Sequence, residues 1–113
     1  MDIIELTDNT FGELATGAGL PVLVEFSARW CGPCRMLAPV LNDLAHEQSE
    51  QLRIAQIDVD ENPETTRRYD VMSMPTLILF VDGREEMRLV GARGKANLVQ
   101  ELAAHLVPAT RTE

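Results

Sequence analysis

The pattern of apolar and polar positions predicts a chain in which strands and helices alternate. Four apolar runs have the length and β-branched content of strands, and they cover Asp2–Leu6, Val22–Phe26, Leu52–Val59 and Thr76–Val81. The second and fourth runs are almost continuously apolar, as expected for strands buried on both faces of a sheet. Asp82-Gly83 then predicts a hairpin turn, which leads into a return strand over Glu86–Val90.

Apolar residues at helical spacing, together with N-cap signals, predict four helices. They cover Phe11–Ala15, a long segment from Cys34 onward, a short segment to about Tyr69, and Lys95–Val107. Thr10 and Glu13 fit a capping box before the first helix. Asn62-Pro63 fits an N-cap and a first-turn proline before the third. Pro39 lies inside the second helix and is expected to kink it.

The predicted order β-α-β-α-β-α-β-β-α indicates an α/β fold with a mixed sheet and helices on both faces. A chain of 113 residues, 45% of them hydrophobic, is long enough for one domain with a substantial core. We expect this domain to span residues 1–107 and to be followed by a short polar tail, residues 108–113.

The charge of the chain excludes several kinds of partner. A formal net charge of −8, with ten scattered basic residues, argues against nucleic acid or an anionic membrane and favours a soluble monomer. The N-terminal sequence MDIIELTD is acidic where a signal peptide would be basic, and no apolar run approaches the roughly 20 residues that span a bilayer. A cytoplasmic location is therefore expected.

The only two cysteines, Cys31 and Cys34, allow three interpretations. A structural zinc site needs two further ligands, but His46 lies roughly 18 Å along the same predicted helix and His105 lies on another. A structural disulfide would close a very short loop and stabilise the fold by only about 2 kcal/mol. Neither interpretation explains the neighbouring residues.

A redox pair accounts for more of the surrounding sequence. Cys31 opens a helix directly after a buried strand, where free backbone N–H groups and the helix dipole favour a thiolate. Cys34, one turn deeper, is expected to be shielded and is close enough to resolve a mixed disulfide. Gly32 permits a tight turn and a close substrate backbone, and Pro33 stiffens the first turn without losing a needed N–H.

Residues 1–107 resemble the thioredoxin family. The resemblance rests on the WCGPC motif at residues 30–34, the Met74-Pro75-Thr76 stretch, Asp82-Gly83 and Gly91-Ala92. It implies a central five-stranded mixed sheet flanked by four helices in three layers. It also implies a redox-active centre that cycles between dithiol and disulfide.

The resemblance further implies supporting roles around the cysteines. Met74–Pro75 is expected to be a cis peptide facing them, with the Met74 backbone pairing with an extended substrate. Trp30 is expected to be a partly exposed cover over the pair. Arg35 is either a solvated residue or a weak stabiliser of the Cys31 thiolate. A shallow apolar substrate groove is expected from Gly32, Pro33, Met74, Gly91 and Ala92.

Glu25 is a candidate proton-exchange residue. In the strand VLVEF it lies on the face opposite Val24, and a buried carboxylate without a partner is energetically costly. The family usually has Asp here with Lys on the neighbouring strand, where this chain has Gln56. We therefore expect a raised pKa at Glu25 and proton exchange with Cys34. Ser27 is a second departure, since the family commonly has an aromatic residue there.

The function that the sequence favours is general protein disulfide reduction. No dinucleotide fingerprint occurs in the chain, so electrons must come from a partner, and no bound cofactor is expected. The resemblance implies a thioredoxin reductase-like flavoprotein that draws on NADPH, and disulfide-containing proteins as substrates. Two alternatives remain, a disulfide oxidase or isomerase and a docking subunit in which the cysteines are incidental.

Overall fold

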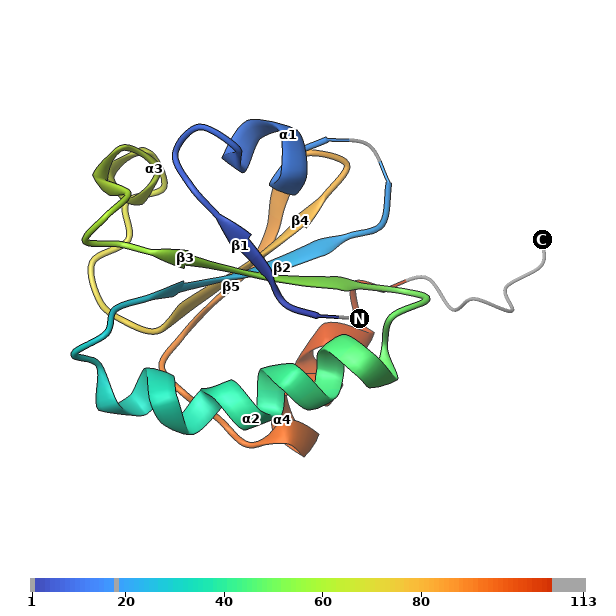
Figure 1. Cartoon of the computed structure of the whole chain (residues 1–113). Coiled ribbons are helices and arrows are strands. Elements are labelled where there is room, and N and C mark those ends of the chain that lie inside the picture. The colour runs from blue at the N-terminus through green and yellow to red at the C-terminus, as the bar shows by residue number, and fades with distance from the viewer. Residues whose placement is uncertain (1, 18, 107–113) are drawn as a thin grey trace.

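A computed structural model describes residues 2–17 and 19–106, and it contains the nine elements in the predicted order (Figure 1). The strands are β1 (Ile4–Leu6), β2 (Val22–Ser27), β3 (Arg53–Asp58), β4 (Thr76–Val81) and β5 (Arg84–Val90). The helices are α1 (Phe11–Ala15), α2 (Gly32–Glu47), α3 (Pro63–Arg68) and α4 (Lys95–Ala103). The predicted tail, residues 108–113, lies outside the described residues.

The five strands form one mixed sheet in the order β1-β3-β2-β4-β5. β3 runs parallel to both β1 and β2, whereas β4 runs antiparallel to β2 and β5. Figure 1 shows α1 and α3 on one face of the sheet and α2 and α4 on the other. The predicted three-layer arrangement is therefore confirmed.

Alternation along the central strand builds a separate core on each face of the sheet. All six residues of β2 are buried. Val22, Val24 and Phe26 pack with Phe11 of α1, whereas Leu23 packs with the leucines of α2 and α4. Because side chains alternate, Glu25 must share the α2 face with Leu23.

Two helices differ from their prediction. α4 ends at Ala103, earlier than predicted. α2 runs through Pro39 as one continuous element. The capping box at Thr10 is wrong, because its hydroxyl accepts a hydrogen bond from the Thr7 N–H and makes none to the helix. The hairpin prediction is confirmed, with positive φ angles of 52° at Asp82 and 80° at Gly83.

Asn62 is the N-cap residue of α3 and Pro63 lies in its first turn, as predicted, but the Asn62 side chain makes no capping bond. Its amide accepts a bond from the Asp8 N–H and donates one to the Asp58 carbonyl. The Asp8 carboxylate instead accepts bonds from the N–H groups of Glu64 and Thr65. A residue far away in the sequence therefore caps α3 and ties it to the segment after β1.

Asp8→Ala is expected to lower the free energy of unfolding by about 1 kcal/mol, because α3 loses the acceptor for its first N–H groups. Urea unfolding at neutral pH measures the change. Asp2→Ala is the matched control, since it removes an exposed aspartate before β1 and should leave the midpoint almost unchanged. An equal loss in the two variants would contradict the capping role.

No helix within the described residues has the length and apolar character needed to cross a membrane.

Candidate active site

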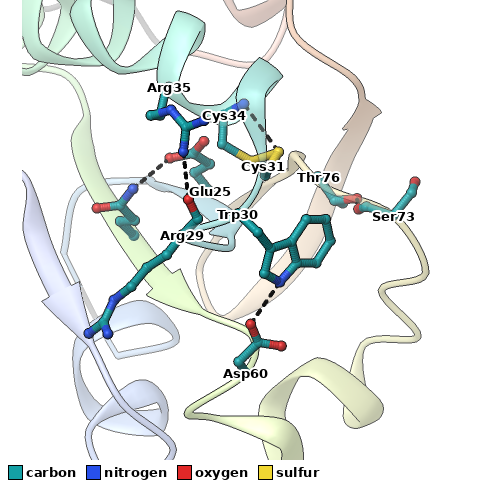
Figure 2. Close-up of a disulfide and its surroundings, with 10 residues drawn as sticks. Glu25, Arg29, Trp30, Cys31, Cys34, Arg35, Asp60, Ser73 and Thr76 are labelled. Carbon is teal, nitrogen blue, oxygen red and sulfur yellow. Dashed lines mark hydrogen bonds between the residues drawn. A yellow bond between two sulfur atoms is a disulfide. The ribbon is translucent and has the colours of Figure 1, made fainter.

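The two cysteines lie where β2 gives way to α2. Cys31 is the N-cap residue of α2 and Cys34 lies in its first turn, with Cα atoms 5.3 Å apart and the side chains joined in a disulfide (Figure 2). The Cys34 N–H donates a hydrogen bond to Cys31 Sγ at 3.2 Å. The strand-to-helix junction therefore aims a backbone donor at one sulfur of the pair.

The position on the helix distinguishes the two cysteines, whereas burial does not, because Cys31 is shielded as well as Cys34. Cys31 is 3% exposed and Cys34 is 4% exposed. Cys31 lies at the N-terminus of a 16-residue helix, where unpaired N–H groups and the helix dipole stabilise negative charge. Pro33 occupies the first turn, where its missing N–H leaves no bond unmade. In the reduced protein this arrangement favours a thiolate at Cys31.

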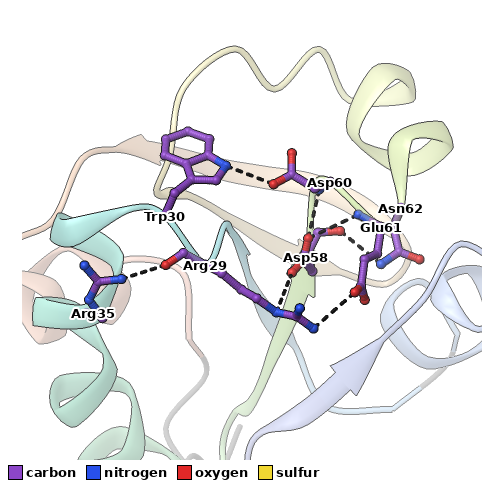
Figure 3. Close-up of polar contacts among 7 residues, drawn as sticks. All are labelled: Arg29, Trp30, Arg35, Asp58, Asp60, Glu61 and Asn62. Atoms are coloured by element: carbon purple, nitrogen blue, oxygen red, sulfur yellow. Dashed lines mark hydrogen bonds and ion pairs between the residues drawn. The ribbon is translucent and has the colours of Figure 1, made fainter.

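Trp30 projects beside the disulfide with 65% of its surface exposed. Its Nε1–H donates a 2.9 Å hydrogen bond to the carboxylate of Asp60, which follows β3 (Figure 3). Local sequence patterns do not identify Asp60. Its place beside Trp30 follows from strand pairing, because Ser27 and Asp58 are register partners at the ends of parallel strands, which places the segments after them together.

Two arginines border the site on the same side. Arg29 forms ion pairs with Asp58 and with Glu61 on the segment after β3 (Figure 3). Arg35 donates a 2.6 Å hydrogen bond from its guanidinium to the Arg29 carbonyl. The guanidinium of Arg35 is therefore held by a backbone oxygen.

The segment before β4 lies opposite the cysteines. The Met74–Pro75 peptide bond is cis, and Met74 packs against the core cluster that contains both cysteines. The Gly91 N–H donates a 2.8 Å bond to the Pro75 carbonyl, which joins the loop after β5 to this segment. Gly91 has a φ of +96°, which favours glycine. Of the other predicted groove residues, Pro33 and Ala92 are exposed and Gly32 is half-buried.

Glu25 is the buried ionisable group behind the disulfide. It is 1% exposed, and its Oε1 accepts a 3.0 Å hydrogen bond from Gln56 Nε2, while Oε2 is buried with no partner among the described residues. Burial raises the pKa of Glu25 to about 7, the Gln56 bond lowers it in part, and the charge of Glu5 adds to the rise. Glu25 can therefore change its protonation state near neutral pH.

An open cavity of about 530 Å³ lies behind Cys34, between the sheet and the start of α2. Its lining residues are Glu5, Ser27, Ala28, Arg29, Cys34, Arg35, Ala38, Gln56, Asp58 and Glu61. The small side chain of Ser27 lies at its wall, where a larger residue would take up space. Within residues 2–17 and 19–106, no three His, Cys, Asp or Glu side chains are grouped to hold a metal ion.

Comparison with known proteins gives a consistent result. The family model named Thioredoxin matches residues 2–104. A thioredoxin from Mycobacterium tuberculosis is 52% identical over 100 residues, which cover 88% of this chain and 86% of that protein. One from Alicyclobacillus acidocaldarius is 49% identical over 98 residues, with 87% and 92% covered. A bifunctional thioredoxin reductase/thioredoxin from Mycobacterium leprae is 51% identical over 100 residues, covering 88% of this chain and 22% of that protein.

Proposed function

The chain belongs to the thioredoxin family, and we propose that it reduces protein disulfides with Cys31 as the attacking sulfur and Cys34 as the resolving sulfur. It is a disulfide oxidoreductase that acts through the Cys31–Cys34 pair. The observation that carries the assignment of roles is the N–H of Cys34 directed at Cys31 Sγ. It supports a thiolate at Cys31 in the reduced protein.

The reaction proceeds in two exchanges. The Cys31 thiolate attacks one sulfur of the substrate disulfide, which breaks that bond and releases the first substrate thiolate. The Cys34 thiolate then attacks Cys31 Sγ, which forms the Cys31–Cys34 disulfide and releases the second substrate thiolate. Two electrons pass to the substrate, and the protein ends in the disulfide state that the structure contains.

Residues around the pair position the substrate and move its protons. We assign substrate contact to Gly32, Pro33, Met74, Gly91 and Ala92, with Trp30 as the cover and cis-Pro75 behind the Met74 backbone. Glu25 takes the proton that Cys34 must lose before it attacks. A carboxyl group with a pKa near the working pH suits this exchange.

A separate reductase must return the disulfide to the dithiol. The bifunctional relative from Mycobacterium leprae carries its reductase in the same chain. This supports a thioredoxin reductase-like flavoprotein, supplied with electrons by NADPH, as the partner of this chain. We further propose that the protein works in the cytoplasm as a monomer and that residues 1–107 form its single domain.

Insulin reduction tests the function. With excess dithiothreitol, catalytic amounts of the protein are expected to precipitate the insulin B chain several-fold faster than dithiothreitol alone, because only the protein presents a preorganised thiolate. A Cys31→Ser, Cys34→Ser double variant is the matched control. A rate equal to that of this control would contradict reductase activity and favour a docking role.

A further inference from the structure

The loop between β5 and α4 carries two residues of the proposed substrate groove. Residues 91–94 connect these elements, and Gly91 and Ala92 come first. The Gly91 N–H donates a 2.8 Å hydrogen bond to the Pro75 carbonyl, beside the Met74 backbone. Ala92 is exposed, so packing against the core does not hold it in place. The shape of this wall of the groove therefore depends on the polar contacts of the loop.

Arg93 brackets the two groove residues. Its Nη2–H donates a 2.9 Å hydrogen bond to the Val90 carbonyl, which is the last backbone oxygen before Gly91. Its Nη1–H donates a 2.7 Å bond to the carboxylate of Glu101 on α4. One planar group therefore joins both ends of the Gly91-Ala92 turn and ties the turn to a helix.

The ion pair between Arg93 and Glu101 is partly shielded from water. The two side chains are 22% and 32% exposed, whereas those of Arg29 and Glu61 are 82% and 61% exposed. Ion pairs between fully exposed side chains hold little geometry, because water competes for both partners. The Nε of Arg93 is buried and has no hydrogen-bond partner among the described residues. The guanidinium is thus placed for its two bonds rather than for complete hydrogen bonding.

α4 gives this contact a rigid support. Leu98 and Leu102 of α4 are buried in the core on the α2 face of the sheet, and Glu101 lies between them in the sequence. A chain of contacts therefore runs from the core through Glu101 and Arg93 to the turn at Gly91. From there it continues through the Pro75 carbonyl to the segment opposite the cysteines.

We propose that Arg93 is a positioning residue that fixes the Gly91-Ala92 wall of the groove for polypeptide substrates. The inference rests on the proposed reductase function. An extended peptide that pairs with the Met74 backbone must also lie against this wall, whereas a small disulfide needs to reach only the Cys31 sulfur. Arg93 therefore acts on the binding of polypeptide disulfides and not on the exchange of sulfur atoms.

The size of the effect follows from the population of the bound arrangement. Without Arg93 the turn is free to adopt other conformations, and only the fraction in the original one binds the peptide. If that fraction is about a tenth to a fifth, the apparent dissociation constant rises about 5–10-fold.

Adduct formation in the Cys34→Ser background tests the proposal. The probe is the disulfide dimer of a short uncharged peptide with a central cysteine, and the adduct is followed by mass spectrometry after acid quenching. Arg93→Met keeps an unbranched stem but has no N–H donors. It should raise the half-saturating peptide concentration about 5–10-fold and change the limiting rate less than about twofold. The rate with 2-hydroxyethyl disulfide should also change less than about twofold. An equal slowing with both disulfides would overturn the proposal.

Two further variants separate positioning from charge. Glu101→Met removes a negative charge where Arg93→Met removes a positive one, so an effect of charge alone would have opposite signs. Loss of the anchor instead predicts weaker peptide binding in both variants, with no further loss in the double variant. Arg84→Met is the matched control, because it removes an exposed guanidinium at the far end of β5 and should leave peptide binding unchanged. Opposite or additive effects of the two substitutions would overturn the proposal.

Hydrogen exchange of the Gly91 amide on the oxidised protein provides a measurement without turnover. Arg93→Met should speed this exchange about 5–10-fold, because opening of the turn breaks the bond to the Pro75 carbonyl. Arg84→Met should leave it unchanged. If Arg93→Met does not fold, Glu101→Met gives the same answer. Failure of the wild type to react with either disulfide would contradict the reductase function, whereas an unchanged Gly91 exchange rate would overturn the role of Arg93.

Discussion

Replacing Cys34 with serine is expected to stop the reductase cycle after its first exchange and to leave the protein covalently joined to its substrate. Cys31 keeps its place at the N-terminus of α2, and the N–H of residue 34 still points at its sulfur, so it can still attack. A serine hydroxyl is not ionised at neutral pH and cannot displace the mixed disulfide. Turnover in the insulin assay should therefore fall by about 10³-fold or more, as when a member of a catalytic unit is removed.

Intact-protein mass spectrometry after mixing with an excess of a disulfide peptide measures the trapped state. Cys34→Ser should gain the mass of one half of the peptide, and dithiothreitol should remove it. Cys31→Ser is the matched control, because it retains a single cysteine in the same turn of the same helix. An adduct on Cys31→Ser and none on Cys34→Ser would reverse the two roles. No adduct on either variant would contradict the exchange mechanism itself.

The elements of the fold could be predicted because each depends on neighbouring residues. The apolar run of Thr76–Val81 is bounded in the structure as the sequence indicates, since Asp82-Gly83 supplies the two positive φ angles of the turn. The last helix departs furthest from its predicted bounds. Its apolar spacing continues to Val107, but regular α-helix ends at Ala103. Periodicity identifies a buried face and does not fix the last residue of a helix.

Contacts between distant segments could not be read from local patterns. Asp8 caps α3 across 57 residues, and the local candidate Asn62 instead serves as a link between β3 and the segment after β1. Asp60 binds Trp30 because two parallel strands end side by side. In each case the partner follows from strand pairing, which is a property of the whole sheet.

The site behind the cysteines was predictable in chemistry but not in shape. The alternation of VLVEF placed Glu25 on a buried face, and its pKa is raised as expected from burial without a cation. The sequence also showed that Ser27 is small. Whether a small residue leaves a cavity depends on how the elements around it pack, and here Ser27, Gln56 and Cys34 border the same open volume.

Glu25→Gln is expected to stabilise the oxidised protein at alkaline pH. An ordinary glutamate pKa is 4.5, and burial raises the pKa of Glu25 in the folded protein to about 7. Between pH 4.5 and pH 7 the folded protein therefore keeps a proton on Glu25 that the unfolded chain has lost. The stability of the wild type should therefore fall as pH rises from about 4.5 to about 7, and by about 3 kcal/mol in all if each pKa unit corresponds to about 1.4 kcal/mol. Glutamine cannot ionise, and its amide oxygen can still accept the Gln56 bond.

Urea unfolding of the oxidised protein at about pH 4.5 and pH 8.5 measures this effect. The two proteins should have similar free energies of unfolding at the lower pH, and Glu25→Gln should be more stable by about 2–3 kcal/mol at the higher pH. Glu13→Gln on α1 is the matched control, since Glu13 is exposed and its replacement should leave the difference between the two pH values unchanged. A pH-independent gain at Glu25 would mean that its carboxyl group ionises normally.

The same variant tests whether the Glu25 carboxylate takes part in disulfide reduction or only lowers the stability of the fold. If Glu25 takes the proton of Cys34, Glu25→Gln should slow disulfide reduction by about 10–100-fold near neutral pH and remove the titration near pH 7 from the pH–rate profile. Greater stability and lower activity would then come from one substitution, as expected where a buried charge is kept for its chemistry. If stability rose and the pH–rate profile stayed the same, the proton would leave Cys34 by another route, and the proton-exchange role of Glu25 would be wrong.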